Sequence, residues 1–128
     1  MSPSRAADAG GAVVEFVLVA ALVVAVALAV LQLVLAAHVR STLAACAAEG
    51  ARVAAVVRQG DDAGGERALA CASASLGTEV AVAVAHESAG GRATVRVTLT
   101  GRAPALSLWR GGDVSASGRA LLEGTDAA

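Results

Sequence analysis

The most unusual ionisable residue of this sequence is Glu15, which stands directly before a long apolar segment. Residues 16–37 contain a single polar side chain, Gln32, within 22 positions. A charged side chain costs about 2.5–3.5 kcal/mol at the centre of a membrane-spanning helix and less near the interface. One interpretation places Glu15 at the headgroup level, where water solvates it and its charge favours the start of a helix. The other interpretation is that Glu15 pairs with a cation.

A cation for Glu15 would arise if the chain were cut after Gly10. The new amino terminus at Gly11 would lie four residues before Glu15. On a neighbouring subunit displaced along the helix axis, that amine could meet the carboxylate in apolar surroundings, where a pair is strong only if both charges are satisfied. Glycine suits a cleavage site because it has no side chain and unwinds at little cost.

Two cysteines, Cys46 and Cys71, are separated by 25 positions on two predicted helices. Outside the cytoplasmic membrane they could form one disulfide, which would stabilise the fold by roughly 3 kcal/mol in the loop-entropy model. The alternative is two buried free thiols, since cysteine packs as a small hydrophobe. Together with His38 and His86 they lack the spacing of a zinc site, and we expect no metal.

No constellation of side chains points to catalysis. The serines at 73, 75 and 88 have no base beside them in a recognisable motif. Asp61 and Asp62 lack the alternating oxygen ligands and terminal glutamate of a calcium loop. We therefore expect no enzymatic activity, no cofactor and no small-molecule substrate.

The composition argues against a soluble enzyme. Hydrophobic residues make up 56% of 128 residues, but only 2% are aromatic, and large side chains supply most of the free energy of burial. The formal net charge is -1, which gives no basic excess for nucleic acid.

The apolar residues concentrate in residues 16–37, which as a helix would span about 33 Å and cross a hydrocarbon core of about 30 Å. A core helix of this length would need a larger protein around it. The segment could instead be a cleaved secretory signal, with small residues at Ala36 and Ala37, which would release an Ala/Arg-rich remnant. The apolar region of such signals has about 7–15 residues, however, and is shorter than the apolar run of this sequence. Arginines lie on both sides of the apolar segment, so the positive-inside rule says little about its orientation in the membrane. We place the region that follows outside.

The segment from Gly10 to Phe16 resembles the processing site of type IV prepilins. In that family a membrane-embedded aspartic peptidase cuts after the glycine and leaves a glutamate at the fifth position of the mature chain. Gly10 matches the glycine before the cut, Gly11 the new first residue and Glu15 the fifth.

Two further elements narrow the resemblance. Residues 11–18, GAVVEFVL, resemble the opening of TadE-like proteins, small pseudopilins of the Flp (tight adherence, type IVb) pilus system. Those chains continue with an Ala-rich helix that bears a Glu-Gly-Ala-Arg element, which here is residues 49–52. The resemblance extends over residues 11–123, and its C-terminal half is similar in pattern only.

Beyond the membrane segment the periodicity predicts two helices and then strands. Residues 38–58 carry a stripe that either covers the chain's own strands or packs against pilin helices, and Glu49 can pair with Arg52 three residues on. Asp61 or Asp62 can cap a second helix, which Gly77 closes. The stripe consists of Val39, Leu43, Cys46, Gly50, Val53 and Val57, the second helix of residues 66–76, and the strands of residues 80–85, 94–100 and 114–122.

These observations predict an α+β protein with a long N-terminal transmembrane helix that continues into an Ala-rich amphipathic helix, a short second helix and a small antiparallel sheet of two to three strands. We divide it into a leader at residues 1–10, cleaved in the pilin interpretation, a transmembrane helix at 11–37, a small extracytoplasmic domain at 38–123 and a disordered tail at 124–128.

The resemblance implies a minor pilin or pseudopilin of the cytoplasmic membrane that helps to assemble a Flp-type pilus for adhesion. The partners it implies are the prepilin peptidase, other pilins and the inner-membrane assembly platform. In that role Glu15, followed by Phe16, guides the registration of neighbouring helices. The alternative is a secreted or membrane-anchored envelope protein that has an ordinary signal or anchor segment and is unrelated to pili.

Overall fold

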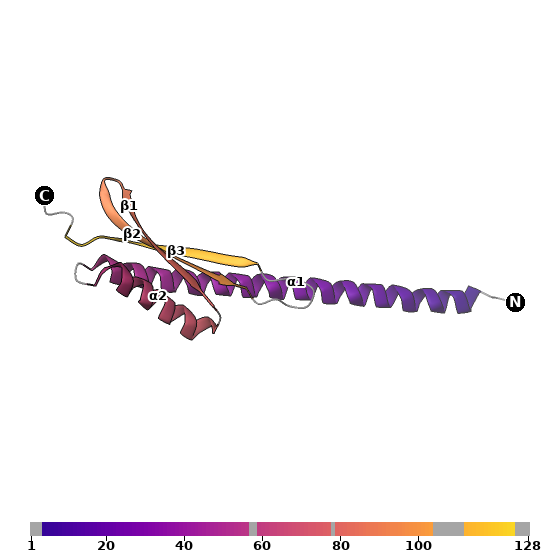
Figure 1. Ribbon diagram of the computed structural model, residues 1–128. Helices are drawn as coiled ribbons and strands as arrows, with labels where there is room; N and C mark the ends of the chain where they lie inside the picture. The colour runs from indigo at the N-terminus through magenta and orange to yellow at the C-terminus, as the bar shows by residue number, and fades with distance from the viewer. Residues whose placement is uncertain (1–3, 57–58, 78, 104–111, 125–128) are drawn as a thin grey trace. The chain divides into compact units, whose positions relative to one another are not determined.

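The computed structural model describes residues 4–56, 59–77, 79–103 and 112–124. It contains two helices, α1 (Ser4–Ala55) and α2 (Gly60–Leu76), followed by three strands, β1 (Ala81–Ala89), β2 (Arg92–Arg102) and β3 (Asp113–Leu121), as Figure 1 shows. The α+β class, the long apolar helix and the antiparallel sheet are therefore confirmed. The chain forms two compact units, residues 1–34 and 35–128, so that α1 contributes to both.

The first unit is the N-terminal part of α1, and its apolar side chains are uncovered. Phe16 is 73% exposed and Leu33 is 71% exposed. An 18-residue stretch of the helix has a mean hydropathy of 3.0, and none of that stretch is buried. Within the described residues this is one helix that is long and apolar enough to cross a membrane by length and composition. This apolar stretch of α1 is therefore not part of the chain's own core.

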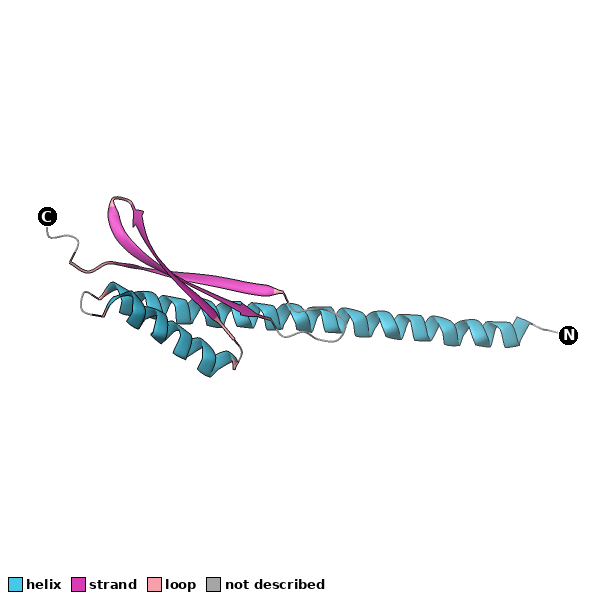
Figure 2. Cartoon of the chain, in the orientation of Figure 1, coloured by secondary structure: helices cyan, strands magenta, loops and turns pink. Residues whose placement is uncertain are grey.

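The second unit is a three-stranded sheet packed on helices. The strands follow the order β1-β2-β3 with antiparallel pairing throughout (Figure 2). On the face toward the helices, Val84 lies opposite Val97, which lies opposite Gly118. The core consists of this face, the C-terminal part of α1 and one face of α2, and its largest fully buried side chains are Leu43, Leu99, Val95, Val97 and Cys46.

Small residues let the two helices and the sheet approach closely. A Cβ added at Gly50 of α1 would lie 2.6 Å from the Cβ of Ala68 in α2. A Cβ added at Gly118 of β3 would collide with the backbone of Ala48. Alanine and glycine at these positions therefore allow the main chains to come into contact. Dispersion between the packed main chains here takes the place of burying large side chains.

The predicted stripe on α1 covers the chain's own sheet and second helix. Val39, Leu43, Cys46 and Gly50 are buried, and Val53 is half-buried. The sixth member, at position 57, lies outside the described residues, as do positions 125–128 of the predicted tail.

The second helix begins earlier than the sequence analysis predicted. It starts at Gly60, not at residue 66, and Gln59 precedes it without a side-chain capping bond. Asp61 and Asp62 lie within its first turn, where their charge favours the helix N-terminus. Gly64 lies within this early part of α2, buried against Ala54, where only a residue without a side chain fits. At the other end, Gly77 closes the helix in the left-handed conformation at φ 63°, as predicted.

The hairpin is tighter than predicted. Strand β1 continues to Ala89, and the connection to β2 consists of Gly90 and Gly91, with φ of 58° and 78°. Two successive residues with positive φ match the right-handed twist of the strands, which is why glycines occupy these turns. The third predicted strand is present as β3, Asp113–Leu121.

Candidate assembly site

Glu15 is the one carboxylate of α1 between Asp8 and Glu49. It lies in α1 with its side chain exposed, between Val14 and Phe16, which are 60% and 73% exposed. No ion pair of Glu15 is present among the described residues. Water would solvate this group in a dissolved helix, but a membrane gives it no such partner, and an intramembrane carboxylate is costly unless it is paired.

The two glycines of the candidate cleavage site are not explained by packing. Gly10 and Gly11 lie inside α1, and a Cβ added at either would meet nothing within 4 Å. Each glycine in a helix interior costs about 1 kcal/mol relative to alanine. The pair therefore weakens α1 locally without any compensating contact in the described part of the chain.

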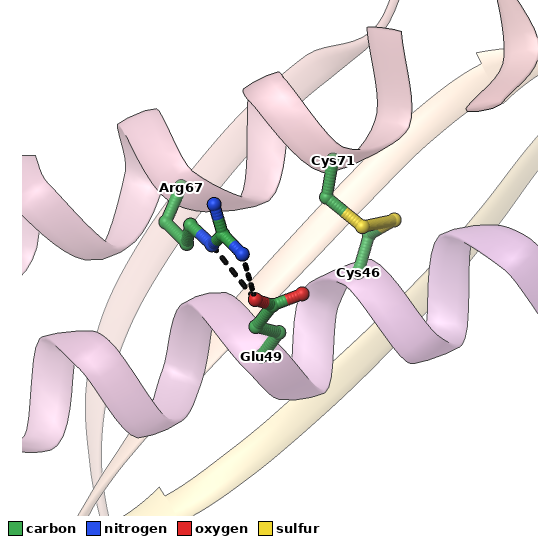
Figure 3. The surroundings of a disulfide bond; sticks show 4 residues. All are labelled: Cys46, Glu49, Arg67 and Cys71. Carbon is green, nitrogen blue, oxygen red and sulfur yellow. Dashed lines mark hydrogen bonds and ion pairs between the residues drawn. A yellow bond between two sulfur atoms is a disulfide. The ribbon is translucent and has the colours of Figure 1, made fainter. Parts of the chain in front are cut away.

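A disulfide joins the two helices in the second unit. Cys46 of α1 and Cys71 of α2 are bonded with an S–S distance of 2.06 Å and a Cα–Cα distance of 5.5 Å (Figure 3). Cys46 is 1% exposed and belongs to the core, whereas Cys71 lies at its edge. Both sulfurs are occupied by this bond, and no group of three or more metal-ligating side chains is found in the described ranges.

An ion pair beside the disulfide corrects the predicted pairing of Glu49. Its partner is Arg67 of α2, whose Nε donates to Oε1 of Glu49 at 2.7 Å (Figure 3). It is not Arg52, which is exposed and has no ion pair or hydrogen bond among the described residues. Arg67 was not predicted as the partner, because the sequence does not show which side of the second helix faces α1.

The Glu-Gly-Ala-Arg element therefore has a structural explanation for its first three residues. Glu49 binds α2 through its side chain, and Gly50 contacts α2 through its backbone. Ala51 is fully buried in the core. Only Arg52 remains exposed.

A second set of charges lies on the sheet. Glu87 of β1 binds Arg96 of β2 at 3.0 Å and approaches Arg119 of β3 at 3.6 Å. His86 and Asp61 connect β1 to the first turn of α2 at 2.7 Å. Sequence reasoning did not identify these contacts, because they depend on strand register and on the early start of α2. They tie neighbouring elements together and have no arrangement of nucleophile and base.

The comparisons with known proteins match the part of the chain that contains residues 11–18 and 49–52. Residues 10–52 match the family model described as TadE-like protein. Comparison with curated proteins and with solved structures gives no match. The matched segment begins at Gly10 and ends at Arg52, so that it contains both Glu15 and the Glu-Gly-Ala-Arg element. The resemblance to TadE-like proteins is confirmed over this segment, and it supports a pilus-associated protein of structural kind with a single-pass membrane anchor.

Proposed function

We propose that this chain, TadE-like over residues 10–52, is a minor pilin or pseudopilin that helps to assemble a Flp-type (type IVb) pilus used in adhesion. The observation that carries the proposal is the unpaired carboxylate of Glu15 at the start of an exposed apolar stretch of α1. A helix of this kind gains most when other helices of the same membrane surround it. Its single charge then fixes which positions along those helices lie side by side.

Processing would create the partner of Glu15. In this proposal the prepilin peptidase removes residues 1–10, and the amine of Gly11 becomes a cation at the new end of the helix. The amine of one subunit meets Glu15 of a neighbour that is displaced along the axis, and Phe16 follows in the apolar contact. Because an unpaired charge in hydrocarbon is costly, only the displacement that brings the two charges together is favourable.

The orientation of the chain follows from the same proposal. Residues 11–37 occupy the cytoplasmic membrane, and residues 38–123 form the extracytoplasmic domain. The Cys46–Cys71 disulfide supports this placement, because disulfides form and persist outside the reducing cytosol. Other pilins and the inner-membrane assembly platform are then the partners of the helix.

The experiment that tests the proposal is intact mass spectrometry of the full chain purified from membranes that contain the prepilin peptidase. We expect a mature protein that begins at Gly11. The control is the same chain in membranes without the peptidase, which should keep residues 1–10. An uncut chain in both membranes would contradict the proposal, and a chain that begins near His38 would favour the ordinary secretory signal of an envelope protein.

The exact bond is tested by two variants. Gly10→Val places a branched side chain before the expected cut and should block processing, whereas Gly11→Ala changes the residue after it and should leave a chain that begins at residue 11. Both positions have open space around them, so neither substitution disturbs a contact of the fold. Processing after Gly11 in the natural chain would move the site by one residue and place Glu15 at the fourth position.

A further inference from the structure

Arg52 is a cation that the fold leaves on its surface. It lies nine residues after the fully buried Leu43, which at 3.6 residues per turn places it on the opposite side of α1 from the core. The carboxylate nearest in sequence, Glu49, is taken by Arg67. No ion pair or hydrogen bond of Arg52 is present in the part of the chain that the structure describes.

Helix α2 carries two carboxylates that are exposed, as Arg52 is, and have the opposite charge. Asp62 and Glu66 are both exposed and are four residues apart, so that they lie on one face of the helix and repel one another. Arg67 does not neutralise them, since it is bound to Glu49. Neither carboxylate has an ion pair within residues 4–56, 59–77, 79–103 and 112–124.

The packing of the two helices sets these groups at the same level along the helical hairpin. Gly50 and Ala54 of α1 both lie against Gly64 of α2. Arg52 stands between the first two residues, while Asp62 and Glu66 flank the third. Within the second unit, the cation and the two anions therefore lie at one level of the hairpin, on the outer sides of its two helices.

We propose that Arg52 of one copy of this chain binds Asp62 and Glu66 of an adjacent copy. The contact would bring the exposed face of α1 against the exposed face of α2. Ser41 and Ala45 share the exposed side of α1 with Arg52, and their small size allows a neighbouring helix to come close. This inference rests on the proposed function, because it takes assembly in one membrane as its setting.

Such a contact can join more than two copies of the chain. It joins two different surfaces of the same chain, so every copy keeps a free Arg52 or a free acidic pair for the next one. Contacts of this heterologous kind produce rings or open helical rows rather than closed two-fold dimers. The contact is thus a lateral one between extracytoplasmic domains, and it does not depend on the pairing of Glu15 within the membrane.

A charge exchange between two differently tagged full-length chains tests this contact. The first variant carries Arg52→Glu, and the second carries Asp62→Arg together with Glu66→Arg. Two copies of either variant meet with like charges, and we expect their co-purification from detergent-solubilised membranes to fall roughly tenfold below that of the natural chain. The first variant mixed with the second restores opposite charges at both contacts, and co-purification should return to near the natural level.

The controls separate this contact from the fold and from the proposed function. Arg92→Glu reverses the charge of an exposed arginine on β2 that has no ion pair among the described residues, and it should leave co-purification unchanged. Formation of the Cys46–Cys71 disulfide, seen as a mobility shift on non-reducing gels, reports that each variant is folded. Folded variants that associate as well as the natural chain, or a mixture that fails to recover, would overturn the contact. A chain that recovers in the mixture but keeps residues 1–10 would sustain the contact and contradict the pilin assignment alone.

Discussion

The carbonyl oxygens of Gly50 and Gly64 each lie 2.7 Å from the position that a Cβ on the other glycine would occupy. This reciprocal approach means that α1 and α2 touch through their main chains. A side chain at either position has to push against backbone, which cannot move aside as a flexible side chain can. The contact fixes the distance between the two helices, and with it the positions of the neighbouring disulfide and ion pair.

Gly64→Ala should destabilise the second unit. The added methyl collides with Ala54 and with the carbonyl oxygen of Gly50, and overpacking of this kind costs about 1–3 kcal/mol. Gly65→Ala is the matched control, because its Cβ would meet Val84 at an ordinary 3.7 Å. It should keep or raise stability by up to about 1 kcal/mol, the difference in helix propensity. Urea unfolding of the full chain in detergent measures both, and equal stability of the two variants would contradict the close contact.

Gly118→Ala should separate β3 from α1. The position of its Cβ is occupied by the backbone of Ala48, so strand and helix must move apart. We expect loss of protection from hydrogen exchange in β3, with smaller losses in β1. Gly101→Ala serves as control, since its nearest neighbour is the Cδ1 of Leu43 at 3.6 Å. Unchanged exchange in β3 of the Gly118 variant would show that the contact is looser than described.

Removal of the disulfide should lower the free energy of unfolding by roughly 3 kcal/mol, the value for a loop of about 25 residues in the entropy model. Cys46→Ser alone leaves a free thiol on α2, so Cys46→Ala with Cys71→Ala gives the cleaner comparison. Thermal unfolding with and without reductant measures the loss. The natural chain under reductant should match the double variant, and an equal melting temperature in all four samples would argue against a structural bond.

The ion pair between Glu49 and Arg67 should matter much less. Their side chains are 42% and 56% exposed, and exposed pairs contribute about 0–1 kcal/mol. A double-mutant cycle with Glu49→Gln and Arg67→Gln measures their coupling. The cycle with Arg52→Gln in place of Arg67→Gln is the control and should give no coupling. A larger coupling to Arg52 would return the pairing to the one that the sequence suggested.

Glu15→Gln should leave membrane insertion intact and reduce incorporation into pili several-fold, because the proposed amine of Gly11 would lose its carboxylate. Asp8→Asn is the control, since Asp8 lies in the proposed leader and would be removed with it. Pilin content of sheared filaments, compared with the membrane content of the same cells, gives the measurement. Equal incorporation of both variants would remove Glu15 from its proposed role.

The sequence predicted the elements of this protein better than their contacts. The 22-residue apolar run, the alternating valines of β1 and β2 and the glycine at position 77 each report on local structure, and all three are found where expected. The place of Gly64 inside α2 was not predicted, because a glycine can end a helix or allow another helix to approach, and only Ala54 opposite it decides between the two. The partner of Glu49 was missed for the same reason, since Arg67 meets it only after the hairpin has closed.

The order of the elements has a consequence for how the second unit folds. The disulfide joins consecutive helices, and β2 and β3 each pair with the strand that precedes them, so these links form between neighbouring elements of the chain. Other contacts join the sheet to the first helix, among them Gly101 of β2 beside Leu43 and Gly118 of β3 beside Ala48. The disulfide can therefore join the two helices before the strands are in place, and the core is complete only when β3 packs on α1.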